Sequence, residues 1–356
     1  MRFPPPPFEH LLRLSDEIGV LEHAVLAAPD PAHGYCTDDV ARALIVVMRE
    51  PRRPKALEAL AERCLTYLEL AQVGDGRFHN RLSIERQWVD EVGSDDACGR
   101  ALWALGVASS SASSADQCRR ARRCFEEGSG FRSRWPRANA FAVLGAVELH
   151  PRRRRARELL EAALAGLGPA ARDPAWPWPE KRLAYANAVL AEARLAGGFA
   201  LGDERLIAEG LDLLRWLVAT ETRGDHFSFA PHDGWEPGAP RPAFDQQPIE
   251  AAAMAAACGR AFDITGDACW SDAALRAAAW FLGANDIGAS LFDPITGGGH
   301  DGLTPHGVNG NEGAESTLAL IAALQQARRL QAAARSAPII SGIPTVAAPT
   351  QRSAAP

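Results

Sequence analysis

The chain has 356 residues, of which 47% are hydrophobic and 23% are charged, and its formal net charge is −6. This composition is sufficient for a folded core, and the negative charge argues against a nucleic-acid or anionic-membrane surface, because those partners select for concentrated lysine and arginine. No stretch has the length and freedom from charge that a membrane-spanning helix needs, and the first ten residues lack the apolar core of a signal peptide. Seven cysteines form no CxxC pair, which favours reduced thiols and predicts a cytoplasmic protein.

Six alanine-rich segments recur along the chain, and most open with an acidic or amide residue in the first or second position. They are DDVARAL from Asp38, DDACGRAL from Asp95, ANAFAVL from Ala138, ANAVLA from Ala186, IEAAAM from Ile249 and EGAESTLA from Glu312. Each interval averages about 55 residues, which leaves room for two helices and a long loop. The segments therefore predict six helical hairpins.

More charged, amphipathic helices are predicted between these segments, over 55–70, 115–127, 153–167, 203–219 and 271–282. In 203–219, leucine and isoleucine recur at three- and four-residue spacing, which marks one buried stripe. A helix of this kind belongs on the outside of a ring, whereas the alanine-rich helices are apolar on nearly every side and form its inner wall. A helix around 8–18 supplies the twelfth element.

Six inner and six outer helices predict an all-α, single-domain (α/α)6 barrel, a six-hairpin toroid, over residues 1–336. Residues 337–356 are rich in proline, serine, threonine and alanine and are expected to form a disordered tail. The alternative is an irregular helical array or solenoid, but solenoid repeats are nearly constant in length. Here the long loops all precede an inner helix, so we expect them on one face.

Carboxylates stand at the start of the first two inner helices. A single aspartate at a helix N-terminus is more often a cap than a catalyst. Asp38 and Asp39 form a pair, as do Asp95 and Asp96, and one carboxylate is enough for capping. We therefore expect Asp39 and Asp96 to face a cleft, with Asp38 and Asp95 as caps or supporting partners.

Glu250 and Glu315 lie just inside the starts of the last two inner helices, among residues too small to screen them. A buried glutamate needs a partner or a substrate, or its pKa rises. A raised pKa suits a general acid, and paired carboxylates across a sugar site act as acid and base or as acid and nucleophile. A purely structural role, with each glutamate bonded to a helix end, remains the alternative.

The loops before the inner helices carry tryptophans, whose flat faces can cover a pyranose ring, and polar side chains that suit a hydroxyl-rich ligand. Glycines 297–299 allow the chain to approach such a ligand closely. The candidate substrate-binding residues are Tyr35, Asp38, His79, Trp88, Asp95, Trp135, Trp178, Asn187, Gln246, Gln247, His300, Asp301 and Asn311.

Motifs for other chemistries are absent from the sequence. There is no phosphate-binding GxxxxGK[ST] loop, no GxSxG nucleophile elbow and no HExxH helix. Cys36 stands beside Asp38, where a helix N-terminus would lower its pKa, so a cysteine nucleophile is an alternative to simple packing. The spacing of aspartate and histidine matches no metal loop, and no metal or other cofactor is expected.

The run HGYCTDDVARAL at 33–44, with EVGSDD at 91–96, FDQQPIE at 244–250 and NEGAEST at 311–317, resembles a bacterial glycosyltransferase-associated family of the six-hairpin glycosidase superfamily. The resemblance spans about residues 8–329 and implies the (α/α)6 fold, with a glycosyltransferase as a candidate partner. The chain departs from the family pattern at Val40, Lys181 and Ala186, where the family has polar or acidic residues. These departures favour catalysis at inner helices one, two, five and six.

The sequence thus predicts a glycoside hydrolase that acts on a bacterial oligo- or polysaccharide, with its acid and base among Asp39, Asp96, Glu250 and Glu315. A sugar epimerase, lyase or phosphorylase on the same barrel is one alternative. A second is a non-catalytic protein that binds glycan for a glycosyltransferase, and a third is a helical interaction scaffold. None of these functions involves binding to nucleic acid or insertion into a membrane.

Overall fold

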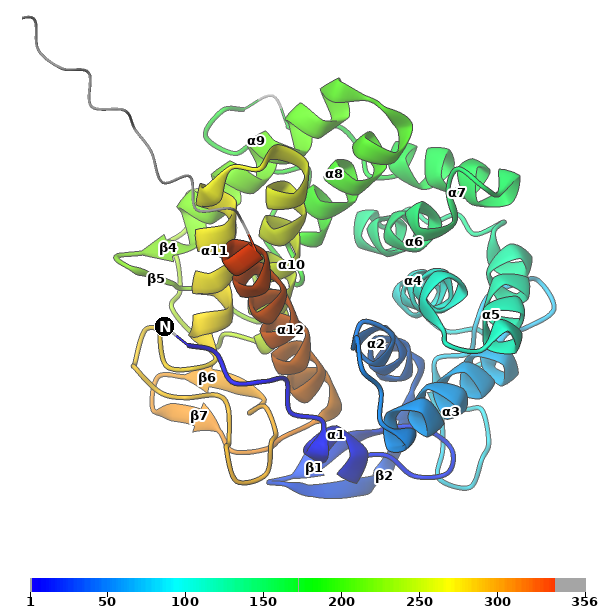
Figure 1. Ribbon diagram of the computed structural model, residues 1–356. Helices are drawn as coiled ribbons and strands as arrows, with labels where there is room; N and C mark the ends of the chain where they lie inside the picture. Colours follow the sequence, from blue (N-terminus) through cyan, green and yellow to red (C-terminus); the bar gives the residue numbers. More distant parts are fainter. Residues whose placement is uncertain (1, 172, 337–356) are drawn as a thin grey trace, which may run out of the picture.

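Six helices stand around a common centre in the computed structural model, which describes residues 2–171 and 173–336 (Figure 1). Each of these inner helices packs against the next, and the last packs against the first, so the ring is closed. They are α2 (Thr37–Met48), α4 (Asp95–Ser111), α6 (Pro136–Leu149), α8 (Val189–Leu201), α10 (Pro248–Thr265) and α12 (Ala314–Ser336). All six coincide with the alanine-rich segments, as predicted.

The remaining helices surround this ring (Figure 1). They are α1 (Glu9–Arg13), α3 (Lys55–Ala71), α5 (Ala115–Gly128), α7 (Arg154–Ala165), α9 (Glu204–Glu221) and α11 (Ala268–Trp280). The predicted (α/α)6 barrel is confirmed. The predicted tail at 337–356 lies outside the described residues.

The first outer helix is shorter than predicted, because α1 ends at Arg13 instead of near residue 18. Asp16 Oδ1 accepts the backbone N–H groups of Ile18 and Gly19, at 2.8 and 3.2 Å. Such a local side-chain turn competes with helical hydrogen bonding. The chain then enters a strand.

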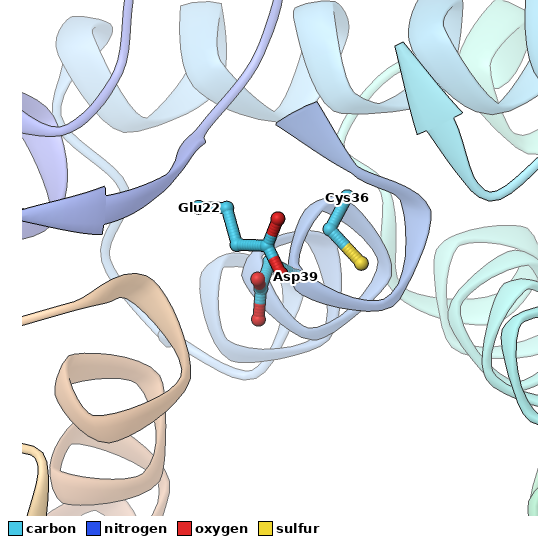
Figure 2. A group of neighbouring side chains, drawn as sticks. All are labelled: Glu22, Cys36 and Asp39. Atoms are coloured by element: carbon cyan, nitrogen blue, oxygen red, sulfur yellow. The ribbon is translucent and has the colours of Figure 1, made fainter. Parts of the chain in front are cut away.

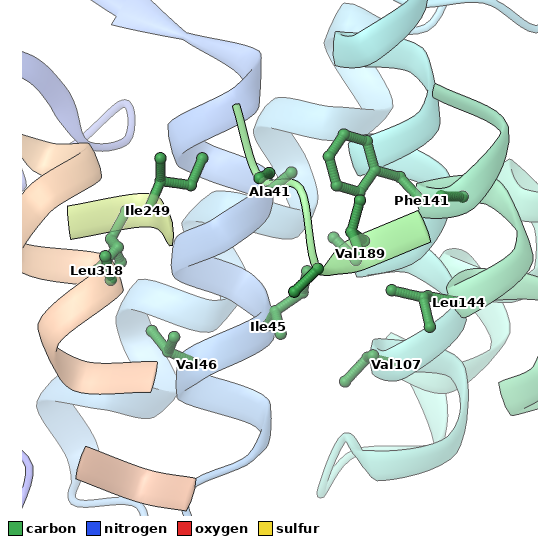
Figure 3. Close-up of a cluster of buried hydrophobic side chains, with 14 of the residues drawn as sticks. Ala41, Ile45, Val46, Val107, Phe141, Leu144, Val189, Ile249 and Leu318 are labelled. Carbon is green, nitrogen blue, oxygen red and sulfur yellow. The ribbon is translucent and has the colours of Figure 1, made fainter. Parts of the chain in front are cut away.

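Apolar side chains from all six inner helices meet in the centre of the ring, where Ile45, Phe141, Val189, Ile249 and Leu318 are among those drawn in Figure 3. All of them are less than a tenth exposed. Burial of such side chains is the main stabilising contribution to a fold of this kind. The alanine-rich composition therefore suits helices that are covered on every side.

Helices α4 and α6 approach each other at backbone distance. A Cβ atom at Gly106 would lie 2.3 Å from the carbonyl oxygen of Gly145, and one at Gly145 would lie 2.4 Å from that of Leu102. Side chains larger than hydrogen do not fit at either glycine without moving backbone. The two glycines thus set the separation of these inner helices.

Short strands, which the sequence did not predict, form within the loops. The largest sheet joins β1 (Leu21–Val25), β2 (Ala28–Cys36) and β3 (Arg81–Leu82) in that order, with both pairs antiparallel. Two further pairs are β4 (Thr222–Arg223) with β5 (His226–Phe227), and β6 (Gly302–Thr304) with β7 (Gly307–Asn309).

The loops are distributed unequally between the two ends of the barrel. Connections that follow an inner helix are short, such as 112–114, 202–203 and 266–267. Connections that precede an inner helix are long and carry all the strands, apart from the brief 129–135. The elaborate loops therefore gather on the face where the inner helices begin, as predicted.

All seven cysteines are free thiols, and five of them are buried. Within the part of the chain that the structure describes, no helix has both the length and the apolarity to cross a bilayer.

Candidate functional site

Two polar cavities adjoin each other at the mouth of the barrel and share Asp38. The first, about 410 Å³, is the α2/α12 cavity, and it lies between β1, β2 and the starts of α2 and α12. The second, about 480 Å³, is the α4/α6 cavity, and it lies between the starts of α4 and α6 and the loop that precedes α8. Both lie on the face with the long loops.

Asp39 lies in the first turn of α2 and lines the α2/α12 cavity, although only 3% of it is exposed. Its Oδ1 accepts a hydrogen bond of 2.5 Å from Arg42 Nη1, while Arg42 Nη2 lies 2.7 Å from Glu315 Oε2 on α12. Burial raises the pKa of Asp39 to about 7, and the charge of Arg42 only partly opposes this. Arg42 thus connects a carboxyl group that is part-protonated at neutral pH to a second carboxylate.

Glu22 on β1 is a third carboxylate at this cavity, and Figure 2 shows it beside Cys36 and Asp39. One ligand atom from each of these three side chains lies within 4.8 Å of the others. Arg81 binds both oxygens of Glu22, with Nη2 at 2.8 Å from Oε1, and Arg42 binds Asp39. Each of these two carboxylates therefore already has an arginine partner.

The Cys36 thiol does not have the environment of a nucleophile. Burial, followed by the charges of Asp39 and Asp38, raises the pKa of Cys36 well above its usual value. The sequence-based expectation that the helix N-terminus would lower this pKa is wrong, because desolvation and neighbouring carboxylates both disfavour the thiolate.

Neither Asp38 nor Asp95 caps its helix. The N-cap of α2 is Cys36, without a side-chain bond, and the N-cap of α4 is Ser94, whose Oγ accepts from Ala97 N at 3.2 Å. Asp38 Oδ1 instead lies 3.1 Å from Arg100 Nε, and Asp95 Oδ2 accepts from Ser133 Oγ at 2.6 Å. Their predicted role as caps is corrected, and both line the α4/α6 cavity.

Asp96 also lines the α4/α6 cavity and accepts a hydrogen bond from the Tyr185 hydroxyl. Burial raises the pKa of Asp96, while the charge of Arg100 opposes the shift. Trp135 stands at the rim of the same cavity with 53% of its surface exposed. The Arg134 guanidinium lies over one face of this ring, 4.7 Å from its centroid. The cavity thus combines carboxylates with a half-exposed aromatic ring.

Glu250 is not brought to either cavity. It is 3% exposed, and its oxygens accept hydrogen bonds from the backbone N–H groups of Ala186 and Asn187 and from Asn187 Nδ2. Ala186 has a positive φ of 45°, so Glu250 holds the loop before α8 in a conformation that a non-glycine residue rarely adopts. Asn187 has a structural role as well, because its backbone N–H and its Nδ2 both donate to Glu250 Oε2.

Glu221, at the end of α9, is a second buried carboxyl near Glu250. Burial raises the pKa of Glu221, and the negative charge of Glu250 raises it further. Burial also raises the pKa of Glu250, although the N–H groups of Asn187 and Ala186 oppose this. The folded protein therefore binds protons at these two groups more tightly than the unfolded chain does.

This difference predicts a pH-dependent stability. The contribution of the two carboxyls is fully present below the ordinary pKa of glutamate, about 4.3, and is lost as the pH rises through the raised values. We expect the urea midpoint of the wild type to fall between about pH 5 and about pH 9, and Glu221→Gln to flatten this profile because the amide does not titrate. The exposed Glu161→Gln is the control, and a Glu221→Gln profile as steep as that of the wild type would contradict the prediction.

Of the other predicted site residues, Gln247 and Asp301 line the α2/α12 cavity. His79 and Trp88 stack on each other with centroids 4.8 Å apart, and the Nδ1 atom of His79 lies 2.6 Å from the carbonyl oxygen of Asp90. Neither ring lines the α2/α12 cavity or the α4/α6 cavity. They lie in the loop that precedes α4.

Two further predicted residues lie in the loop before α12, outside both cavities. Asn311 Oδ1 accepts from Leu26 N at 2.9 Å and so joins this loop to the β1–β2 turn. His300 belongs to a separate cluster with Asp293 and Glu312.

Three predicted substrate-binding residues are buried in the packing and face no cavity among the described residues. Tyr35 is 1% exposed and its hydroxyl donates to Asp16. Trp178 is fully buried and stacks on Trp216. Gln246 is also fully buried, and its Oε1 accepts from Phe229 N and Trp280 Nε1. A binding role for them is corrected to a structural one.

The arginines of the site were not among the predicted residues. Arg42 follows Asp39 by three positions and Arg100 follows Asp96 by four, a spacing that brings side chains together on a helix. That spacing was a usable signal. Glu22 carried none, because its position depends on the unpredicted strand β1.

Below the two cavities the lumen narrows to an apolar shaft of about 90 Å³. Side chains of all six inner helices line it, including Trp103, Phe141 and Leu318, and Arg42 and Glu315 form its upper end. At the opposite end of the barrel it adjoins a cavity of about 600 Å³, with Arg49 and Glu192 at the junction.

No protein-family model matches the chain, and no curated protein matches it either. Solved structures share its fold at low sequence identity. A sugar epimerase from a ruminal bacterium has a TM-score of 0.70 at 11% identity, over 90% of this chain and 95% of that chain. Cellobiose 2-epimerase from Spirochaeta thermophila has a TM-score of 0.66 at 15% identity, over 91% and 93%.

The GH76 α-mannanase of Bacteroides thetaiotaomicron also shares the fold, with a TM-score of 0.61 at 11% identity, over 85% of this chain and 88% of that chain. These similarities establish the six-hairpin (α/α)6 barrel. At such identities they establish the fold alone.

Proposed function

We propose that this chain is a carbohydrate-active enzyme, a glycoside hydrolase that cleaves an oligo- or polysaccharide at the α2/α12 cavity. The observation that carries the proposal is Asp39, a carboxyl with a pKa raised to about 7 that lines a polar cavity beside Glu315. A carboxyl that retains its proton near neutral pH can donate it to a glycosidic oxygen. A second carboxylate can then act as base or nucleophile.

Asp39 suits the role of acid and Glu315 that of base. The side chain of Asp39 is 4% exposed, whereas that of Glu315 is 37% exposed and therefore more open to water and to substrate. Arg42 lies between them and positions both side chains.

The adjoining α4/α6 cavity suits a neighbouring sugar unit. Trp135 offers a half-exposed ring, and Asp95 and Asp96 offer acceptors for hydroxyl groups. Because the two cavities share Asp38, a chain of sugars laid across the mouth would occupy both. This arrangement supports an oligo- or polysaccharide over a single sugar.

Incubation with a panel of bacterial glycans tests the proposal. We expect new reducing ends, detected chemically and by mass spectrometry, and these should appear without added phosphate. A product that requires phosphate would indicate a phosphorylase, and an unsaturated product would indicate a lyase. Glycans recovered intact across the panel would contradict hydrolysis.

A sugar epimerase or isomerase is the second candidate, because a sugar epimerase, cellobiose 2-epimerase and D-mannose isomerase are among the structural neighbours. Asp39 could then move a proton at the carbon next to a carbonyl group. In H2O this activity would give a product with the mass of the substrate, and in D2O the product would carry one deuterium at that carbon. A hydrolase gives no such exchange.

The resemblance to a glycosyltransferase-associated family supports a bacterial glycan as substrate and a glycosyltransferase as partner. It also supports a non-catalytic protein that binds glycan for that enzyme. Such a protein would bind sugar and release it unchanged, with Asp39→Asn binding as well as the wild type. Product formation that depends on Asp39 would exclude it.

A further inference from the structure

We propose that Asp293, His300 and Glu312 form a site for a divalent transition-metal cation such as Zn²⁺. One ligand atom from each side chain lies within 4.8 Å of the other two. The site lies in the loop that precedes α12, and its three residues line neither the α2/α12 cavity nor the α4/α6 cavity.

A tight hairpin brings Asp293 and His300 together. Phe292 pairs with Gly299, Asp293 N donates to Gly298 O at 3.1 Å, and His300 N donates to Leu291 O at 2.9 Å. Asp293 and His300 therefore lie on opposite sides of one hairpin, each next to the Phe292–Gly299 pair.

Glu312, just before α12, lies under this hairpin and is 2% exposed. A Cβ atom at Gly298 would lie 2.0 Å from Glu312 Oε2, so only glycine lets the hairpin close over this carboxylate. The run of three glycines thus brings the loop to Glu312. The sequence had instead predicted that these glycines approach a sugar ligand.

Each of the three side chains keeps an atom free for a ligand. Asp293 uses Oδ1 for the N–H groups of Ile295 and Thr296, and Glu312 uses Oε2 for the Thr296 hydroxyl at 2.7 Å. Among the described contacts, Asp293 Oδ2 and Glu312 Oε1 take no hydrogen bond. The Nδ1 atom of His300 is buried and has no hydrogen-bond partner.

The two carboxylates also lack a positive partner. In residues 2–171 and 173–336, no arginine or lysine lies within 4.0 Å of either, and the nearest candidate is His10, whose Nδ1 is 3.6 Å from Glu312 Oε2. That nitrogen accepts from Arg13 Nη1 at 3.2 Å, while Nε2 faces the carbonyl oxygen of Glu312 at 2.8 Å. His10 thus faces the carbonyl oxygen of Glu312 through Nε2 and the Arg13 guanidinium through Nδ1.

Glu312 is buried and Asp293 is partly exposed. A buried carboxylate without a counter-charge is costly, and a cation beside both groups removes that cost. The Glu22, Cys36 and Asp39 cluster differs, because Arg81 and Arg42 already form ion pairs with its carboxylates. An imidazole nitrogen with two carboxylate oxygens suits Zn²⁺ or Mn²⁺ better than Ca²⁺ or Mg²⁺. Ligand distances of about 2.1 Å would require these atoms to move closer together than a spacing of 4.8 Å.

The ion would fix one wall of the α2/α12 cavity. Asp301 follows His300 directly, lines that cavity, and accepts from Gly313 N and Ser316 Oγ, both at 2.8 Å. A cation that joins the hairpin to Glu312 therefore holds Asp301 against the start of α12. Its role is structural and does not depend on the reaction that the cavity performs.

Metal analysis of the full-length chain tests this site. After EDTA treatment, the protein is dialysed against Zn²⁺, and bound metal is measured by mass spectrometry, with thermal unfolding followed by circular dichroism. We expect about one Zn²⁺ per chain and a higher Tm, and at least about tenfold weaker binding in His300→Ala and in Asp293→Asn. The conservative Asp293→Asn provides the test if His300→Ala does not fold.

Two control variants locate the ion. His306→Ala changes an exposed histidine in the neighbouring β6–β7 turn and should retain the metal. Cys36→Ser should also retain it, because the thiol belongs to the other cluster. Absence of Zn²⁺ from the wild type, unchanged affinity in His300→Ala and Asp293→Asn, or loss of the ion in Cys36→Ser would each overturn the proposal.

Discussion

Asp39→Asn is expected to lower the rate of glycan cleavage by about two to four orders of magnitude, because an amide cannot deliver the proton that the leaving oxygen needs. Substrate affinity should change little, since asparagine retains the size of aspartate and an acceptor for Arg42. Reducing-end release measured over a range of substrate concentrations separates the two effects. Asp212→Asn, at an exposed position on α9, is the matched control.

The pH profile provides an independent check of this role. Burial raises the pKa of Asp39 to about 7, and a general acid works only in its protonated form. The wild-type rate should therefore decline as the pH rises above about 7. An Asp39→Asn variant that keeps the wild-type rate and the same decline would contradict the assignment.

Gly145→Ala is expected to lower the free energy of unfolding by about 1 to 3 kcal/mol, the usual range for overpacking. Alanine gains about 1 kcal/mol over glycine in helix propensity, so the clash must exceed that gain. It does so because the atoms within 2.8 Å of the added Cβ are backbone atoms of Leu102 and Trp103, which cannot rotate away. Urea unfolding monitored by circular dichroism gives the difference.

Gly130→Ala is the control for this measurement. Gly130 has nothing within 4 Å of an added Cβ, and its φ lies outside the left-handed region. We expect no loss of stability there. Equal or greater stability of Gly145→Ala would mean that α4 and α6 do not meet at backbone distance.

The barrel could be predicted from sequence because its inner and outer helices differ in composition. Segments such as 249–262 are apolar on nearly every side and fit only an inner wall, whereas the stripe in 203–219 fits an outer helix. Strand β2 could not be predicted, because its sequence, APDPAHGYC, has two prolines and a glycine and no alternation. It forms through pairing with β1 and β3, and the β3 partner is distant in the chain.

The candidate site was predicted only in part, because some of its residues are placed by contacts that are distant in the chain. Helix starts are local features, so Asp39 and Asp96 could be placed at the mouth. The fate of Glu250 could not, because the N–H groups that bind it belong to Ala186 and Asn187, more than sixty positions earlier. Likewise, nothing local distinguishes the buried Trp178 from the exposed Trp135, since each stands before an inner helix.

The narrow shaft constrains how a polymer can meet this ring. Its volume of about 90 Å³ is below the roughly 150 Å³ of a protein cavity that holds benzene, and a pyranose ring is larger than benzene. A polysaccharide bound as proposed is therefore not expected to pass through the toroid. It would arrive and depart by the same opening, and any advance along the polymer would require release from the mouth.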